Sequence, residues 1–148
     1  MAKSSNPITP QMNSQELGNF LAKPILMNLA TVTPDGYPHV VPVWFEHNEG
    51  TGEFLVSVDQ KSKKFRNLSK SPTAGFSIAE NQLPYPAVVG YGNVTITADP
   101  ENELLKRLTR KYLPPEKADN YCQELINTRY SSVTLTIKPS WILSWTGE

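Results

Sequence analysis

The sequence is poor in the residue types that build metal sites and covalent cross-links. It has one cysteine, Cys122, and two histidines, His39 and His47, in 148 residues. A single thiol excludes an internal disulfide and a zinc site made of several thiolates. Two imidazoles are also too few for a histidine-rich metal site, so we expect no bound metal.

Long apolar runs and an excess of one charge are missing as well. No stretch approaches the roughly 20 apolar residues that a membrane-spanning helix needs, and the polar start, MAKSSNPITPQMNS, lacks the apolar region of a signal peptide. The 14 basic residues balance the 14 acidic residues, so no overall field favours nucleic acid or a membrane surface. We expect a cytoplasmic protein with neither of these as a partner.

Short apolar segments separated by turn residues make up most of the chain. We expect residues 1–12 to form a flexible arm and residues 13–148 to form one domain of common size. Asn13 and Glu16 predict a capping box that opens a short helix. Strand-like segments follow over Leu26–Thr33, Tyr37–His47, Glu53–Asp59, Ala74–Ala79, Val88–Ala98, Val133–Lys138 and Trp141–Trp145.

Two helices are expected between the last strands. Asp99-Pro100 predicts an N-cap followed by proline at the first helical position, and Pro115 opens a second helix. Short antiparallel strands with few helices indicate a mainly β fold. We predict a closed or nearly closed barrel of six or seven strands with peripheral helices.

The segment PDGYPHVVPVWF (34–45) combines a hairpin turn with an apolar strand that contains Pro38 and Pro42. Proline has no N–H to donate to a sheet and is normally found at sheet edges or bulges. The sequence therefore predicts that this strand lies at an edge.

The segment SVDQKSKKFRNLSK (57–70) contains five basic residues and one acidic residue. Asp59 or Ser62 can cap a short helix that would carry Lys63 and Lys64 in its first turn. Two ammonium groups at the positive end of a helix dipole repel it, whereas a bound phosphate makes the same position favourable. Two interpretations stay open: a phosphate-binding turn, or an ordinary solvated basic face.

In order and spacing, four segments resemble the pyridoxamine 5′-phosphate oxidase-like split-barrel superfamily from about Asn13 to Trp145. They are LATVTPDGYPHVVPVWF, VSVDQKSKKFRNLSKSPTAGFSI, PYPAVVGYGNVTI and VTLTIKPSWILSW. The chain is most similar to the branch that uses the deazaflavin coenzyme F420, in which PHVVPVWF and KxRNLxxxP patterns are typical. Other relatives bind FMN. The resemblance implies a split barrel that forms a homodimer with the cofactor in a groove at the subunit interface.

The resemblance also implies which residues bind the cofactor. The backbone of Val41, Pro42, Val43 and Trp44 would lie along the ring, and Ser57 and Val58 would contact the ring edge or the ribityl chain. Lys63 and Lys64, of which Lys64 is the stronger match, would bind the phosphate. Tyr91 and Trp145 of the partner subunit would complete the pocket. In such a groove the N–H groups of Val43 and Trp44 are expected to be free for the ring.

The implied activity is hydride transfer between F420 and an unsaturated or heteroaromatic organic substrate, because such a cofactor carries the reaction itself. No catalytic residue is assigned; Tyr85, Tyr91 and His39 are the available proton donors. Pyridoxamine phosphate oxidases carry an arginine- and histidine-bearing motif after their last tryptophan, whereas Trp145 precedes only Thr-Gly-Glu, so pyridoxamine phosphate is not the expected substrate.

Three alternatives remain. The first is an FMN-dependent oxidoreductase or flavin reductase of the same fold. The second is a protein that binds the cofactor without turnover, because a pocket does not by itself imply a reaction. The third, a barrel that binds single-stranded nucleic acid, is disfavoured because the basic segment is local and backbone tracking needs an extended positive groove.

Overall fold

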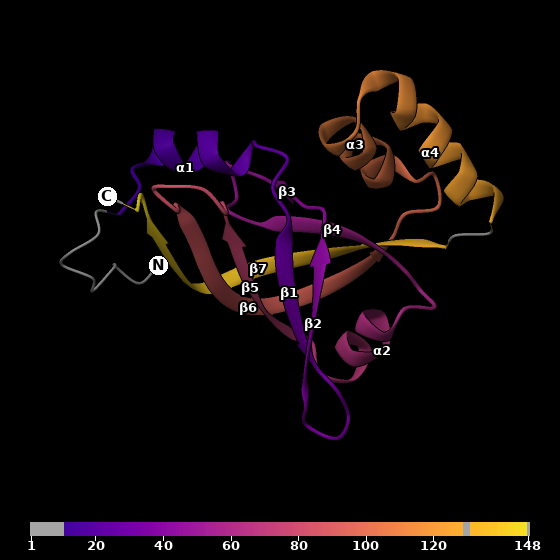
Figure 1. Ribbon diagram of the computed structural model, residues 1–148. Helices are drawn as coiled ribbons and strands as arrows, with labels where there is room; N and C mark the ends of the chain where they lie inside the picture. The colour runs from indigo at the N-terminus through magenta and orange to yellow at the C-terminus, as the bar shows by residue number, and fades with distance from the viewer. Residues whose placement is uncertain (1–10, 129–130, 148) are drawn as a thin grey trace.

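The computed structural model describes residues 11–128 and 131–147, and within these ranges the chain forms one antiparallel sheet of seven strands that curls into a half-barrel (Figure 1). The strand order is β2-β1-β5-β6-β7-β4-β3. The expected mainly β barrel with peripheral helices is confirmed. The strands are β1 (Met27–Val32), β2 (Pro38–Val43), β3 (Glu46–His47), β4 (Phe54–Asp59), β5 (Thr73–Ala79), β6 (Ala87–Ala98) and β7 (Ser132–Trp145).

Four helices surround the sheet in the described ranges: α1 (Ser14–Leu21), α2 (Lys63–Lys70), α3 (Glu103–Tyr112) and α4 (Pro115–Asn127). The predicted capping box of α1 is confirmed, since the Glu16 N–H donates to Asn13 Oδ1 at 2.8 Å and the Asn13 N–H donates to Glu16 Oε1 at 3.0 Å. Helices α3 and α4 form a helical hairpin between β6 and β7, at the side of the barrel opposite the chain termini in Figure 1.

The core lies inside the curl of the sheet, where alternate residues of each strand point. On β4, for example, Phe54, Val56 and Val58 are buried and the residues between them are partly exposed, which is the period of two that a half-buried strand shows. The Phe54 ring contacts the rings of Phe45 and Phe76, with centroids 5.9 and 4.7 Å away. Met12, expected in the loose arm, is buried in this core, so the packed chain begins before residue 13; residues 1–10 of that arm lie outside the described residues.

Several predicted boundaries were wrong in instructive ways. The last two predicted strands are one strand, β7, in which a bulge places Ser140 between the residues opposite Tyr91 and Gly92. The predicted strand 37–47 divides into β2 and the two-residue β3. Pro100 is not helical: α3 begins at Glu103, and the Asp99 carboxylate caps it across a turn by accepting from Glu103 N–H at 2.9 Å.

Strand β2 is an edge strand, as the two prolines predict. The Thr33 N–H donates to the Tyr37 oxygen at 2.8 Å, so this pair belongs to the hydrogen-bonded kind. Because pairs alternate along an antiparallel ladder, the next pair, Val32 with Pro38, is of the other kind, and so is the pair formed by Pro42. Both prolines therefore stand where an N–H would point away from the sheet, and neither costs a ladder bond.

Candidate functional site

The two edges of the sheet meet where β2 runs into β3. Only Trp44 and Phe45 separate these strands in the chain. Strand β3 pairs with the first two residues of β4, so among the described residues the rest of β4, Val56–Asp59, has a free edge on that side. Helix α2 contacts both β1 and β4 next to this opening. The sheet is thus split at this place and not closed.

A cavity of about 170 Å³ lies at the split, and we call it the split cavity. One wall comes from the end of β2, from β4 and from α2, and the other wall comes from the helical hairpin. Its lining residues are Val43, Trp44, Ser57, Lys64, Leu105, Leu108, Tyr121 and Leu125. The fold therefore brings together four of the residues that the sequence assigned to the cofactor, from three separate segments.

Lys64 is the charged group of the split cavity. Ser62 caps α2 by accepting from Phe65 N–H at 3.3 Å, so Lys64 falls in the first turn of the helix. Burial lowers the pKa of Lys64, and the nearby Asp59 carboxylate opposes this shift in part. Among the described residues Lys64 forms no ion pair. A partly desolvated cation at a helix N-terminus, where backbone N–H groups are also free, favours an anion as a ligand.

Ser57 faces the same cavity without a partner. Its hydroxyl oxygen is buried, yet it forms no hydrogen bond with any described residue. Buried polar groups in folded proteins are nearly always hydrogen-bonded, so an unsatisfied hydroxyl indicates a missing partner. Ser57 and Lys64 thus offer a hydroxyl and an ammonium group to one small ligand group.

The helical hairpin is fixed to the barrel through aromatic contacts at Trp44. The Trp44 ring stacks on Tyr112 with centroids 5.1 Å apart and planes 6° apart, and it contacts Tyr121 at 5.6 Å. The hairpin residues of the cavity were missed from the sequence, where their spacing indicates only a core stripe. The one signal available in the sequence is Tyr121, an aromatic residue in that stripe. In the structure Tyr121 is 40% exposed.

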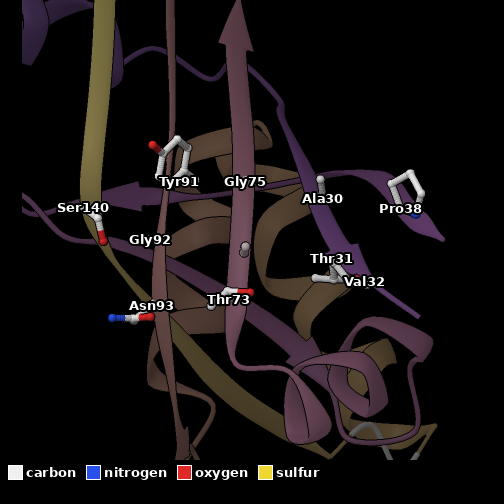
Figure 2. Close-up of a pocket in the computed structure, with 11 residues that line it drawn as sticks. Ala30, Thr31, Val32, Pro38, Thr73, Gly75, Tyr91, Gly92, Asn93 and Ser140 are labelled. Carbon is white, nitrogen blue, oxygen red and sulfur yellow. The ribbon is translucent and has the colours of Figure 1, made fainter. Parts of the chain in front are cut away.

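A second hollow, of about 360 Å³, lies on the outer face of the sheet, and we call it the outer trough. Figure 2 shows that Tyr91 stands at one side of it and Pro38 at the other, with Ala30 and Gly75 between them. The hollow forms because β1 and β5 carry only the small residues Ala30 and Gly75 at this place. Tyr91 is 55% exposed and stacks on Trp141 at 5.4 Å.

The remaining assigned residues lie elsewhere. Val41 is packed against the core, Pro42 is exposed on β2, and Lys63 is exposed beside Lys64. Trp145 lies at the end of β7, outside the outer trough. Val58 is only 1% exposed as a whole residue, so it offers almost no surface to a ligand. In this chain these residues do not line the cavity that Lys64 lines.

The prediction that the N–H of Val43 is free for the ring was wrong. Val43 pairs with Met27 in a position that alternates with Pro42, so its N–H points toward β1. By the same alternation, Val40 is the residue between the two prolines whose N–H points outward. Val40 is also 58% exposed as a residue.

The three proposed proton donors are dispersed. Tyr85 is 51% exposed on the loop between β5 and β6, Tyr91 lies on the outer face, and His39 lies on β2. His39 Nδ1 is buried without a hydrogen-bond partner among the described residues. None of the three lines the split cavity.

Two further properties can be stated for residues 11–128 and 131–147. Their helices are too short and too polar for any to cross a membrane. Their His, Cys, Asp and Glu side chains form no group of three or more that could hold a metal ion.

Comparison with known proteins shows a family match and similar solved structures. The family model described as pyridoxamine 5′-phosphate oxidase matches residues 14–145. A conserved hypothetical protein from Mycobacterium tuberculosis has a TM-score of 0.75 at 22% identity, covering 98% of this chain and 91% of its own.

Two other similar structures have named ligands in their descriptions. An F420 reductase has a TM-score of 0.63 at 26% identity, with 84% of this chain and 93% of that one covered. A pyridoxamine 5′-phosphate oxidase-related, FMN-binding protein from Nostoc punctiforme has a TM-score of 0.61 at 16% identity, with 85% and 79% covered. The search of curated proteins gave no match.

Proposed function

Because this chain belongs to the pyridoxamine 5′-phosphate oxidase family, we propose that it is an oxidoreductase with a flavin-type cofactor. F420 is favoured, and FMN is the alternative. The substrate is a small organic molecule that exchanges hydride with the cofactor. The similarity to an F420 reductase at 26% identity supports the choice of F420.

The observation that carries this proposal is the pairing of Lys64 with the unsatisfied Ser57 hydroxyl in the split cavity. F420 and FMN both carry a phosphate group, and a helix N-terminus with an unpaired lysine suits a phosphate. The residues present therefore fit the proposed cofactor. Lys64 is the principal phosphate ligand, and the exposed Lys63 adds charge from the side.

The size of the split cavity places a limit on what it holds. Its volume of about 170 Å³ is well below the roughly 300 Å³ at which ligand pockets usually begin. We assign the phosphate end of the cofactor to this cavity and the ring to the free edge of β2. There the outward N–H of Val40 can donate to the ring, and the prolines on either side prevent a foreign strand from pairing.

A ring on an open edge needs a cover to exclude water. We propose that a second copy of the chain supplies it in a homodimer, through the outer face that carries Tyr91 and, at the end of β7, Trp145. This face exposes Val32, Val40 and Tyr91 by 40%, 58% and 55%, a degree of apolar exposure that is typical of an interface. The cofactor supplies the hydride chemistry, and the protein orients and encloses it.

The decisive experiment is a fluorescence titration with matched ligands. F420 is compared with its chromophore lacking the phosphate-bearing chain, and FMN is compared with riboflavin. The variants are Lys64→Met and, as a control with a lysine in the last turn of the same helix, Lys70→Met. A hydrogen bond to a charged group contributes about 1.5–3 kcal/mol, so Lys64→Met should weaken the phosphate-bearing ligand about tenfold to a hundredfold.

The same variant should leave the affinity for the phosphate-free ligands unchanged, and Lys70→Met should have little effect on either. The proposal fails if neither F420 nor FMN binds at micromolar concentration. The assignment of Lys64 is wrong if both lysine variants weaken binding equally. Turnover of reduced cofactor with a panel of unsaturated substrates then separates an enzyme from a protein that only binds.

A further inference from the structure

A third hollow, of about 510 Å³, lies outside the proposed cofactor site, and we call it the end cleft. It is bounded by α1, by the loop between β3 and β4, and by the middle of β7. Its lining residues are Ser14, Leu17, Gly18, His47, Glu49, Thr51, Gly52, Lys138, Pro139 and Ile142. None of them lines the split cavity or the outer trough, and its volume is within the range of roughly 300–1,000 Å³ found for small-molecule sites.

Two opposite charges line the end cleft without neutralising each other. Glu49 comes from the loop after β3, and Lys138 comes from β7 directly before the bulge at Ser140. The two ion pairs formed by described residues join Lys23 to Glu80 and Arg107 to Glu46, and neither involves Glu49 or Lys138. A ligand that carries a positive and a negative group can therefore pair with both side chains.

The Glu49 carboxylate lies against Gly18, in the middle of α1. A Cβ atom placed on Gly18 would collide with the Glu49 carboxylate. Glycine inside a helix lowers its stability relative to alanine, and eight residues make α1 a short helix. The absence of a side chain at Gly18 leaves room for the Glu49 carboxylate beside the helix.

The polar and apolar lining also suits an amphiphilic molecule. His47 Nδ1 is buried and has no hydrogen-bond partner among the described residues. Burial lowers the pKa of His47, although the Glu49 carboxylate opposes this shift, and a neutral imidazole can donate one hydrogen bond and accept one. Leu17, Pro139 and Ile142 provide the apolar lining.

We propose that the end cleft binds a small zwitterion with an apolar side chain, of the free amino-acid type. Its ammonium group pairs with Glu49, its carboxylate pairs with Lys138, and its side chain packs on Leu17, Pro139 and Ile142. A site of this kind would let the concentration of such a compound regulate the protein from outside the proposed cofactor site.

Matched probes and variants test the two charge contacts separately. L-leucine is titrated into the full chain by NMR, together with leucinamide, which lacks the carboxylate, and N-acetyl-leucine, which lacks the ammonium group. The variants are Lys138→Met and Glu49→Gln, and Lys70→Met is the control. Ion pairs near a surface contribute up to about 1 kcal/mol, so each matched loss should weaken L-leucine about fivefold.

Each variant is tested with the ligand that lacks the matching charged group. Lys138→Met should weaken L-leucine but leave leucinamide unchanged, and Glu49→Gln should weaken L-leucine but leave N-acetyl-leucine unchanged. Both side chains are exposed, so the variants should fold, and urea unfolding checks this. The proposal is overturned if L-leucine causes no shifts at millimolar concentration, or if its affinity responds to Lys70→Met as strongly as to the cleft variants.

Discussion

The hydroxyl group of Tyr112 should stabilise the whole fold, because it joins the helical hairpin to the barrel. It donates to the Ile25 oxygen at 2.6 Å and accepts from Phe45 N–H at 3.2 Å. These two residues lie just before β1 and just before β3, so one side chain connects α3 to both segments. Burial raises the pKa of Tyr112 to about 12, against the opposing hydrogen bond to Phe45, so the hydroxyl keeps its proton over the usual pH range.

Tyr112→Phe removes these bonds but keeps the ring that stacks on Trp44. Each of the two hydrogen bonds contributes about 0.5–1.5 kcal/mol net, so the free energy of unfolding should fall by about 1–3 kcal/mol. For a domain of this size the urea dependence is about 2 kcal/mol per molar, so the unfolding midpoint should decrease by roughly 1 M. The slope itself should not change, because the buried area stays the same.

Urea unfolding followed by circular dichroism below pH 9 measures this effect. Tyr121→Phe is the matched control: Tyr121 also contacts Trp44, but its hydroxyl forms no hydrogen bond with a described residue. The control should change the free energy of unfolding by less than about 0.5 kcal/mol. Equal losses in both variants, or none in Tyr112→Phe, would refute the role of the hydroxyl group.

Two further predictions concern Gly92, beside the bulge of β7, and Lys111, a partly buried lysine of α3 that donates to the Leu21 and Phe45 oxygens. A Cβ on Gly92 would meet the backbone of Lys138, whereas one on Gly75 has only an ordinary contact with the Gly90 oxygen at 3.8 Å. Gly92→Ala should therefore lower the free energy of unfolding by about 3 kcal/mol through overpacking. Gly75→Ala should lower it much less in the same urea assay. Burial lowers the pKa of Lys111 from 10.5 to about 8, so above pH 8 the unfolded chain holds a proton that the folded chain has lost. Stability should therefore rise with pH between about 8 and 10.5. Lys111→Met should reduce this rise, while Lys64, whose pKa burial also lowers, still contributes to it. A pH dependence unchanged in the variant would contradict the prediction.

The sequence predicted the edge strand because its cause is local. A turn, an alternating pattern and two prolines lie within a dozen residues, and proline excludes a central position wherever an N–H is needed. The direction of each N–H was not predictable, since it depends on which pair of the ladder comes first. Val43 was assigned a free N–H for this reason, and the hairpin bond at Thr33 showed the opposite.

Strand β7 was predicted as two strands, one ending before Pro139 and the other beginning after it. Proline in a central strand normally costs a ladder bond, and β7 lies between β6 and β4. The pairing with β4 ends at Ile137, however, so in the described structure β7 has a free edge beyond that residue. Pro139 lies on this free part, opposite Gly92. Only the long-range register shows this, and a single sequence does not contain it.

The candidate site divides in the same way. Ser62, Lys63 and Lys64 were predictable because a cap and its first turn are adjacent in the chain. The wall formed by the helical hairpin was not, because Tyr121 and Leu125 lie more than 50 residues from Lys64 and follow an ordinary apolar helical pattern. Their role follows from the stack of Trp44 on Tyr112, which fixes the hairpin over the split.

Under the proposed function, the open edge of β2 would link cofactor binding to dimer assembly. The split cavity is too small for a whole flavin, and Pro38 and Pro42 block the edge to another strand. A ring on that edge therefore gains cover only from a surface that does not need ladder bonds, such as the outer face around Tyr91. If one cofactor contacts two subunits, it binds the dimer more tightly than the monomer, and mass action requires it to favour the dimer by the same free energy. Removal of the phosphate contact at Lys64 should then weaken the ligand's effect on dimerisation together with its affinity.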